Sequence, residues 1–163
     1  MEDKALLSTE VASGAEKAEL LIVIPAYNEA ENIERVVNHL TANFPQYDYV
    51  VVNDGSRDET AAICQRNGYN LLNLPVNLGL AGAFQAGLKY ADKYGYQYAV
   101  QLDGDGQHRP EYLESMIKKM EEGYDIVIGS RFVGEKKPFT MRMLGSNLIE
   151  MAIRFTTGVN IKD

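Results

Sequence analysis

The residues best suited to chemistry lie between Gln101 and His108, in the segment QLDGDGQH. Asp103 and Asp105 stand two positions apart directly after an apolar run, with glycine between and after them. Glycine lets the backbone turn and lets a bulky ligand approach closely. Paired carboxylates without thiolates suit a hard divalent ion, Mg²⁺ or Mn²⁺, that also holds a substrate diphosphate, and His108 is a candidate further ligand. The alternative is an acidic surface turn, because aspartate and glycine are common turn residues.

Other motifs with two nearby aspartates do not match this segment. An EF-hand loop needs glycine at its sixth position, where His108 stands. A haloacid-dehalogenase-type phosphatase would carry threonine or valine in place of Gln107. The first apolar run is followed by PAYNEAEN instead of GxGxxG, and no GxxxxGK[ST] loop occurs. Dinucleotide and P-loop sites are therefore disfavoured.

Two polar clusters stand earlier in the chain. In VVVNDGSRDET, Asp54 ends an apolar run, where a carboxylate accepts a hydrogen bond from a base N–H or a ribose hydroxyl. A turn followed by a helix cap explains the same residues. In IPAYNEAENI, Pro25 fixes the strand exit, and Glu29 stands beside a helix start, where it either caps the helix or reaches a ligand.

Two more clusters follow them. Small residues around Gly79, in NLGLAGAFQAGL, either bring backbone N–H groups to an anion or let a helix pack closely on a sheet. Arg131, Lys136 and Lys137, in GSRFVGEKK, form either a basic lid over phosphates or a solvated loop.

Alternating apolar runs and helical periods predict the elements that position these clusters. The predicted strands are 20–24, 47–52, 69–74, 96–102 and 125–129, and the predicted helices are 30–44, 58–66, 81–94, 110–122 and 141–157. This alternation is typical of an α/β fold with a mostly parallel sheet and helices on both faces. Such sheets bind ligands at the carboxyl ends of their strands, which is where all these clusters fall.

Composition and charge further limit the possible functions. The chain has 163 residues, a net charge of -7 and a single cysteine, Cys64, which we interpret as structural. An acidic chain without a basic stripe is poorly suited to bind nucleic acid. No apolar run approaches the ~20 residues of a membrane span, and no signal peptide is evident. We therefore expect a cytoplasmic domain, with residues 1–19 as a polar tail and 20–163 as one core.

Five segments, in chain order, resemble the motifs of family-2 glycosyltransferases of the GT-A fold: IPAYNEAENI, VVVNDGSRDET, NLGLAGAFQAGL, LDGDGQH and GSRFV. Within that family the chain most resembles the dolichol- or polyprenyl-phosphate sugar transferases. The resemblance implies a Rossmann-like sheet and metal-assisted transfer, with inversion, from a nucleoside-diphosphate sugar. It implies a polyprenyl phosphate or a growing glycan as acceptor, in cell-wall or polysaccharide biosynthesis.

The resemblance also assigns residues. It places Pro25, Ala26, Tyr27 and Glu29 in the nucleotide pocket and Asp54 at the base or ribose, and we add Gly79 to that set. Asp103 and Asp105 match the family's DxD motif: Asp105 is the more direct ligand of Mg²⁺ or Mn²⁺, and Asp103 supports it or contacts the ribose. Arg131 falls near the diphosphate or the acceptor phosphate. Asp103, Asp105 and Arg131 are thus the expected catalytic residues.

Family domains continue beyond the GVNIKD at which this chain stops. We therefore expect a C-terminally truncated donor-binding core, whose full-length protein associates peripherally with the inner face of the membrane. Two alternatives stay open. One is a non-catalytic nucleotide-binding or interaction fragment of this fold. The other is a sugar-1-phosphate nucleotidyltransferase, which would want a glycine-rich, arginine-containing loop where PAYNEAEN stands.

Overall fold

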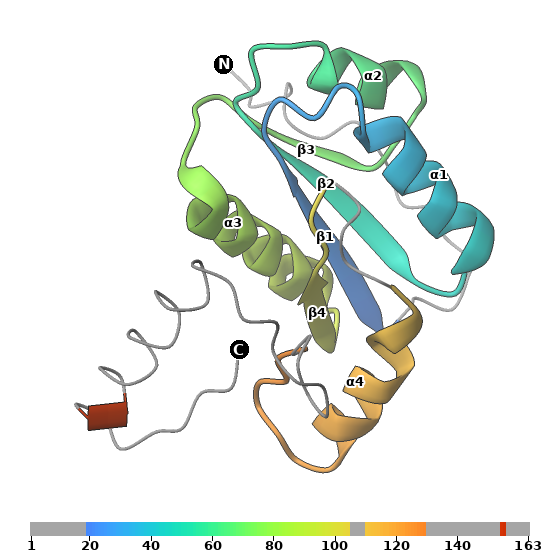
Figure 1. Ribbon diagram of the computed structural model, residues 1–163, viewed down its shortest axis with the longest axis vertical. Coiled ribbons are helices and arrows are strands. Elements are labelled where there is room, and N and C mark those ends of the chain that lie inside the picture. Colours follow the sequence, from blue (N-terminus) through green and yellow to red (C-terminus); the bar gives the residue numbers. More distant parts are fainter. Residues whose placement is uncertain (1–18, 105–109, 130–153, 156–163) are drawn as a thin grey trace, which may run out of the picture. The chain divides into compact units, whose positions relative to one another are not determined.

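The computed structural model describes residues 19–104, 110–129 and 154–155 (Figure 1). The chain forms two compact units, which span residues 1–111 and 112–163. In its described part, the first unit contains a β-sheet and three α-helices, and the second contains helix α4 (Leu113–Glu121).

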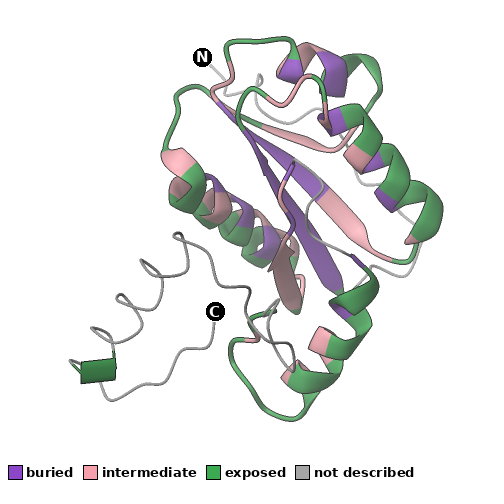
Figure 2. Ribbon diagram, in the orientation of Figure 1, coloured by how far each residue is buried: buried purple, intermediate pink, exposed green. Residues whose placement is uncertain are grey.

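The sheet has four parallel strands in the order β3-β2-β1-β4. These are β1 (Leu20–Ala26), β2 (Asp48–Asp54), β3 (Leu71–Leu74) and β4 (Tyr98–Gln101). β1 lies between two neighbours, since Val23 pairs with Val50 of β2 and with Gln101 of β4. Every residue of β1 is buried, as its continuous apolar run predicts (Figure 2).

The helices of this unit cover both faces of the sheet, as predicted (Figure 1). Helix α3 (Gly79–Tyr94) packs on one face, where Ala83 and Ala91 join Leu21 and Val52 in a buried cluster. Helices α1 (Ile33–Asn43) and α2 (Thr60–Arg66) lie on the other face of the sheet. Because successive side chains of a strand point to opposite faces, every second side chain of β1 points toward these two helices. Strands joined by helices bring the β1–α1, β2–α2 and β3–α3 loops to one edge.

Most predicted boundaries shift by one to three residues, and two of these shifts have identifiable reasons. β1 continues through Pro25, which pairs in register with Val52, because the proline ring removes one N–H donor but leaves the backbone extended. Helix α3 begins at Gly79 instead of residue 81, because the amide of Asn77 accepts a bond from the Gly79 N–H and so starts the helix earlier.

The predicted strand 125–129 is not a strand. Its backbone is irregular, and the side chains of Ile126 and Ile128 are 77% and 84% exposed. An apolar segment becomes a strand only when a neighbouring strand takes its hydrogen bonds, and no ladder among the described residues reaches this one. Only residues 154–155 of the predicted helix 141–157 are described, and they are helical. Of the predicted tail 1–19, only Glu19 falls within the described residues.

Close packing of α3 on β1 depends on Gly87. A Cβ built on Gly87 would overlap the side chain of Val23. We expect Gly87→Ala to lower the free energy of unfolding by about 1–3 kcal/mol through overpacking, although alanine is the better helix former. Urea denaturation measures this difference, with Gln85→Ala on the exposed side of the same helix as the control. Equal stability of the two variants would contradict the close approach.

The thiol of Cys64 provides a second check on the core. The side chain is fully buried in α2, and burial raises its thiol pKa to about 11. Because the thiolate is the reactive form, the folded protein should react far more slowly with Ellman's reagent at about pH 8 than the urea-unfolded chain does. The reaction reports on this residue alone, since the chain has one cysteine. If the folded protein reacted as fast as the unfolded chain, the Cys64 thiol would not be buried between α2 and the rest of the core.

Candidate functional site

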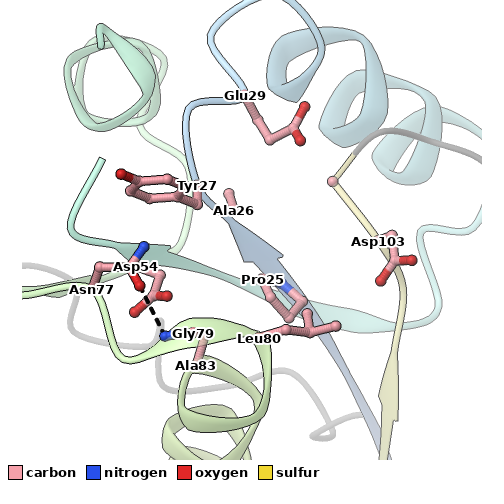
Figure 3. Close-up of a pocket in the computed structure, with 11 residues that line it drawn as sticks. Pro25, Ala26, Tyr27, Glu29, Asp54, Asn77, Gly79, Leu80, Ala83 and Asp103 are labelled. Carbon is pink, nitrogen blue, oxygen red and sulfur yellow. Dashed lines mark hydrogen bonds between the residues drawn. The ribbon is translucent and has the colours of Figure 1, made fainter. Parts of the chain in front are cut away.

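A pocket of about 280 Å³ opens at the carboxyl ends of β1, β2 and β4, beside the first turn of α3 (Figure 3). Seven residues predicted for nucleotide-sugar binding line it: Pro25, Ala26, Tyr27, Glu29, Asp54, Gly79 and Asp103. Four further residues complete the lining: Asn77, Leu80, Ala83 and Gly104. Residues from four separate sequence motifs therefore meet around one cavity.

Asp54 ends β2 on the face that carries α3, and its side chain is only 3% exposed. One carboxylate oxygen, Oδ1, accepts a hydrogen bond of 2.7 Å from the backbone N–H of Leu78. The next residue, Gly55, has a φ of +65°, and a Cβ there would lie 2.7 Å from backbone atoms of Val76 and Asn77. The end of β2 and the β3–α3 loop are therefore in direct contact.

Asn77 and Gly79 form the floor of the pocket at the start of α3. The N–H of Gly79 donates to Oδ1 of Asn77 over 3.0 Å, the dashed line in Figure 3. This N–H is therefore already used within the protein, and an anion would have to compete with the Asn77 amide for it. Gly79 instead offers space, because no described atom lies within 4 Å of the position of a Cβ on it.

Asp103 and Gly104 follow β4 and lie against the end of β1. The N–H of Leu102 donates to the carbonyl of Val23, and Oδ1 of Asp103 accepts a bond of 2.9 Å from the side-chain amide of Gln101. A Cβ on Gly104 would stand 3.1 Å from the Pro25 carbonyl oxygen. The small residue after Asp103 thus lets this turn approach the strand closely.

Glu29 enters the pocket from the β1–α1 loop, as Figure 3 shows. Its Oε2 accepts a bond of 2.9 Å from the side-chain amide of Asn32, and its own N–H donates to Oγ1 of Thr60. The ring of Tyr27 is 43% exposed, and Leu80 across the opening is 60% exposed. These two side chains offer apolar surface at the rim of a polar pocket.

Among the described residues, the charged side chains that line the pocket are carboxylates: Glu29, Asp54 and Asp103. These three carboxylates repel a diphosphate, and a cation bound beside them would offset that repulsion. Within the described residues, no three histidine, cysteine or acidic side chains are close enough to hold a metal ion. The remaining predicted ligands, Asp105 and His108, and the predicted catalytic Arg131 lie outside the described residues.

Four residues that line the pocket were not among the site residues predicted from the sequence. Asn77 precedes Gly79 in NLGL, and an asparagine before a helix is the available signal for it. Gly104 lies inside the predicted acidic turn, where the sequence predicts a glycine that lets the backbone turn and a ligand approach, but it was not assigned to the site. Leu80 and Ala83 carry no polar atom that would mark them, and only the position of the first turn of α3 brings them to the pocket.

The family model for glycosyl transferase family 2 matches residues 21–163. The chain is 34% identical over 152 residues to a polyprenol monophosphomannose synthase from Mycolicibacterium smegmatis, covering 88% of this chain and 57% of the relative. It is 32% identical to an undecaprenyl-phosphate mannosyltransferase from Micrococcus luteus, covering 88% of this chain and 62% of that protein. The chain thus spans about half the length of the curated relatives it matches.

Solved structures share the fold. A Pyrobaculum calidifontis mannosyltransferase, in complex with GDP-Man and Mn²⁺, superposes with a TM-score of 0.51 at 21% identity, over 63% of this chain and 32% of that one. S. aureus TarS superposes with a TM-score of 0.50 at 27% identity, again over 63% of this chain and 32% of the other. The GT-A-like α/β fold predicted from the sequence is therefore confirmed. No helix within the described residues is long and apolar enough to cross a membrane.

The contact between Gly55 and the β3–α3 loop can be tested with a matched pair of glycines. Gly55 and Gly68 both adopt left-handed φ, +65° and +66°, but no described atom lies within 4 Å of a Cβ on Gly68. Gly68→Ala should therefore cost only the backbone strain, about 1–2 kcal/mol. Gly55→Ala should cost more, because its Cβ also meets backbone. Urea denaturation of both variants gives the comparison, and equal losses would contradict the tight contact at Gly55.

Proposed function

The chain belongs to glycosyl transferase family 2, and we propose that it is the donor-binding core of an enzyme that transfers a sugar from a nucleoside diphosphate to an acceptor with inversion. The observation that carries this proposal is the meeting of residues from four family-like motifs around one pocket. The pocket lies at the carboxyl edge of a parallel sheet, which is where α/β proteins bind their ligands.

The ligand atoms that the pocket lining offers to a metal suit a divalent ion. Its described lining offers carboxylate oxygens and neither thiol nor imidazole, and such hard oxygen ligands suit Mg²⁺ or Mn²⁺. Asp105 and Asp103 would hold the ion, with His108 as the candidate further ligand. When bound, the ion acts as a Lewis acid that stabilises the charge developing on the departing diphosphate.

The pocket residues bind and orient the donor. The Tyr27 ring and the Leu80 side chain offer apolar surface for a base or sugar face, and the second carboxylate oxygen of Asp54 accepts from a base N–H or a ribose hydroxyl. By the resemblance of GSRFV to the family motif, Arg131 would contact the diphosphate or the acceptor phosphate. The acceptor oxygen then attacks the anomeric carbon from the side opposite the leaving group, which inverts that centre.

A polyprenyl phosphate is the acceptor we favour over a growing glycan. The names of the relatives from Mycolicibacterium and Micrococcus contain polyprenol and undecaprenyl phosphate. A phosphate oxygen is already anionic, so its attack needs little help from a general base. Because such a lipid stays in the bilayer, we place the full-length protein at the cytoplasmic face of the membrane, in peripheral contact with it.

Donor binding should stabilise the folded chain. We expect one nucleoside diphosphate among UDP, GDP, dTDP and CDP to raise the melting temperature in the presence of Mn²⁺ and not with chelator. At 100 times its dissociation constant a ligand contributes about 2.7 kcal/mol, which is several degrees for a chain of this size. Differential scanning fluorimetry measures the shift.

Two variants sharpen this experiment. Asp105→Ala should lose the metal-dependent shift, because it removes the predicted direct ligand. Asp92→Ala removes the same charge from an exposed position near the end of α3, far along the helix from the pocket, and should keep the shift. The absence of a shift with all four nucleotides in the folded wild-type chain would contradict donor binding.

Sugar transfer itself is tested by offering the matching nucleotide sugar with undecaprenyl phosphate or with an oligosaccharide, and detecting the product by mass spectrometry. We expect a glycosyl phospholipid product and an inverted anomeric centre by NMR. Nucleotide binding without transfer to either acceptor, in a protein of the length of the relatives, would favour the non-catalytic alternative.

A further inference from the structure

Three consecutive backbone N–H groups of the β1–α1 loop donate to side chains of the β2–α2 loop and of the first residue of α2. The N–H of Asn28 donates to Oγ of Ser56 at 3.0 Å, and that of Glu29 donates to Oγ1 of Thr60 at 2.9 Å. The N–H of Ala30 donates to Oδ2 of Asp58 at 3.0 Å. These three residues directly follow Tyr27, and Glu29 itself lines the pocket. These hydrogen bonds therefore fix the β1–α1 loop, which carries two pocket residues, to the neighbouring segment 56–60.

Within this set of bonds, Asp58 and Thr60 depend on each other. Oδ1 of Asp58 accepts the Thr60 hydroxyl at 2.6 Å and the Thr60 N–H at 3.0 Å. The Thr60 hydroxyl thus donates to Asp58 while its oxygen accepts from Glu29, and the Thr60 side chain is fully buried. Burial raises the pKa of Asp58, but the bonds from Thr60 and Ala30 lower it by more, so the pKa lies below its usual value. Asp58 is therefore an ionised acceptor at neutral pH.

The β1–α1 loop also accepts a hydrogen bond from the β2–α2 loop. Asn28 has a φ of +58°, the single positive φ among described residues other than glycine, and its Oδ1 accepts the N–H of Arg57 at 2.9 Å. A left-handed residue costs energy, so the surrounding bonds must impose it. Neither Asp58 nor Thr60 lines the pocket. Their side chains act on the pocket only through the loop that they hold.

We infer that Asp58 and Thr60 are positioning residues, which fix the 27–30 segment and thereby set the affinity of the pocket for a nucleoside diphosphate. The inference deepens the proposed function and rests on it. The hydroxyl of Thr60 and the carboxylate of Asp58 supply the acceptors that keep Tyr27 and Glu29 in place before a ligand arrives, so binding does not have to order this loop.

The test compares four variants by isothermal titration with the nucleoside diphosphate that binds the wild type, in Mn²⁺. Thr60→Val keeps the shape and loses the hydroxyl, and Asp58→Asn removes the charge and replaces one of the two acceptor oxygens by an NH₂ donor. Each should weaken binding by about tenfold, the effect of losing a bond to a charged or buried group. Thr60→Ser keeps the hydroxyl and should bind like the wild type. Val37→Ala destabilises buried α1 without touching either loop and should also bind normally.

Unchanged binding in Thr60→Val and Asp58→Asn would overturn the inference, as would an equal loss in Val37→Ala, since that loss would reflect stability alone. If Asp58→Asn does not fold, Ser56→Ala replaces it, because it removes one acceptor at a partly exposed position. Its effect should be in the same direction.

A second readout separates this inference from the proposed function. Amide hydrogen exchange of Asn28, Glu29 and Ala30, measured without ligand, should be faster in Thr60→Val than in Thr60→Ser. If the wild type binds none of the four nucleotides, the proposed function fails, and these exchange rates alone decide whether the two side chains hold the loop. Equal exchange in both variants would show that they do not.

Discussion

The backbone N–H groups released where β1 and β3 end impose the constraint on which the pocket depends. A strand that stops leaves donors without ladder partners, and such donors must find other acceptors. Here side chains of neighbouring elements supply them: Thr60, at the start of α2, accepts from Glu29, and Asp54, at the end of β2, accepts from Leu78. The β1–α1 and β3–α3 loops are therefore each held by a side chain from another element. A pocket lined from several loops follows from satisfying these donors, before any ligand is considered.

Parallel order and small residues bring those loops close enough for such bonds. Because β1 lies between β2 and β4, the turns after all three strands end at the same edge. Gly55 lets the end of β2 contact the β3–α3 loop, and Gly104 lets the acidic turn contact the end of β1. On the α3 face, Gly87 sets how closely the helix approaches Val23. The close approach of neighbouring segments at these glycines therefore determines both how the core packs and how the pocket is shaped.

The sequence predicted the parts of this arrangement that follow from periodicity. Continuous burial of β1, helices on both faces and the gathering of Glu29, Asp54 and Asp103 at one edge need only strand order and a parallel sheet. It failed where a tertiary partner decides. The apolar segment 125–129 has a strand-like composition, but among the described residues no neighbouring strand takes its hydrogen bonds. Leu80 could not be identified because an exposed leucine has no chemical signal. Asp58 was interpreted only as a candidate helix cap, and nothing in the sequence indicated that Asp58 and Thr60 bond to the β1–α1 loop. The ligand roles assigned to the pocket residues stay predictions.

The central claim is that the pocket at the carboxyl edge of the sheet binds the donor nucleotide. An NMR titration of the ¹⁵N-labelled chain with a nucleoside diphosphate and Mg²⁺ tests it most directly, because each backbone amide reports its own surroundings. We expect the largest shifts at Ala26, Tyr27, Asp54, Gly79 and Gly104, with little change at Tyr96 and Asp48, whose hydrogen bond lies at the start of β2. Saturable shifts centred on residues outside the pocket, with Tyr27 and Gly79 unmoved, would contradict it.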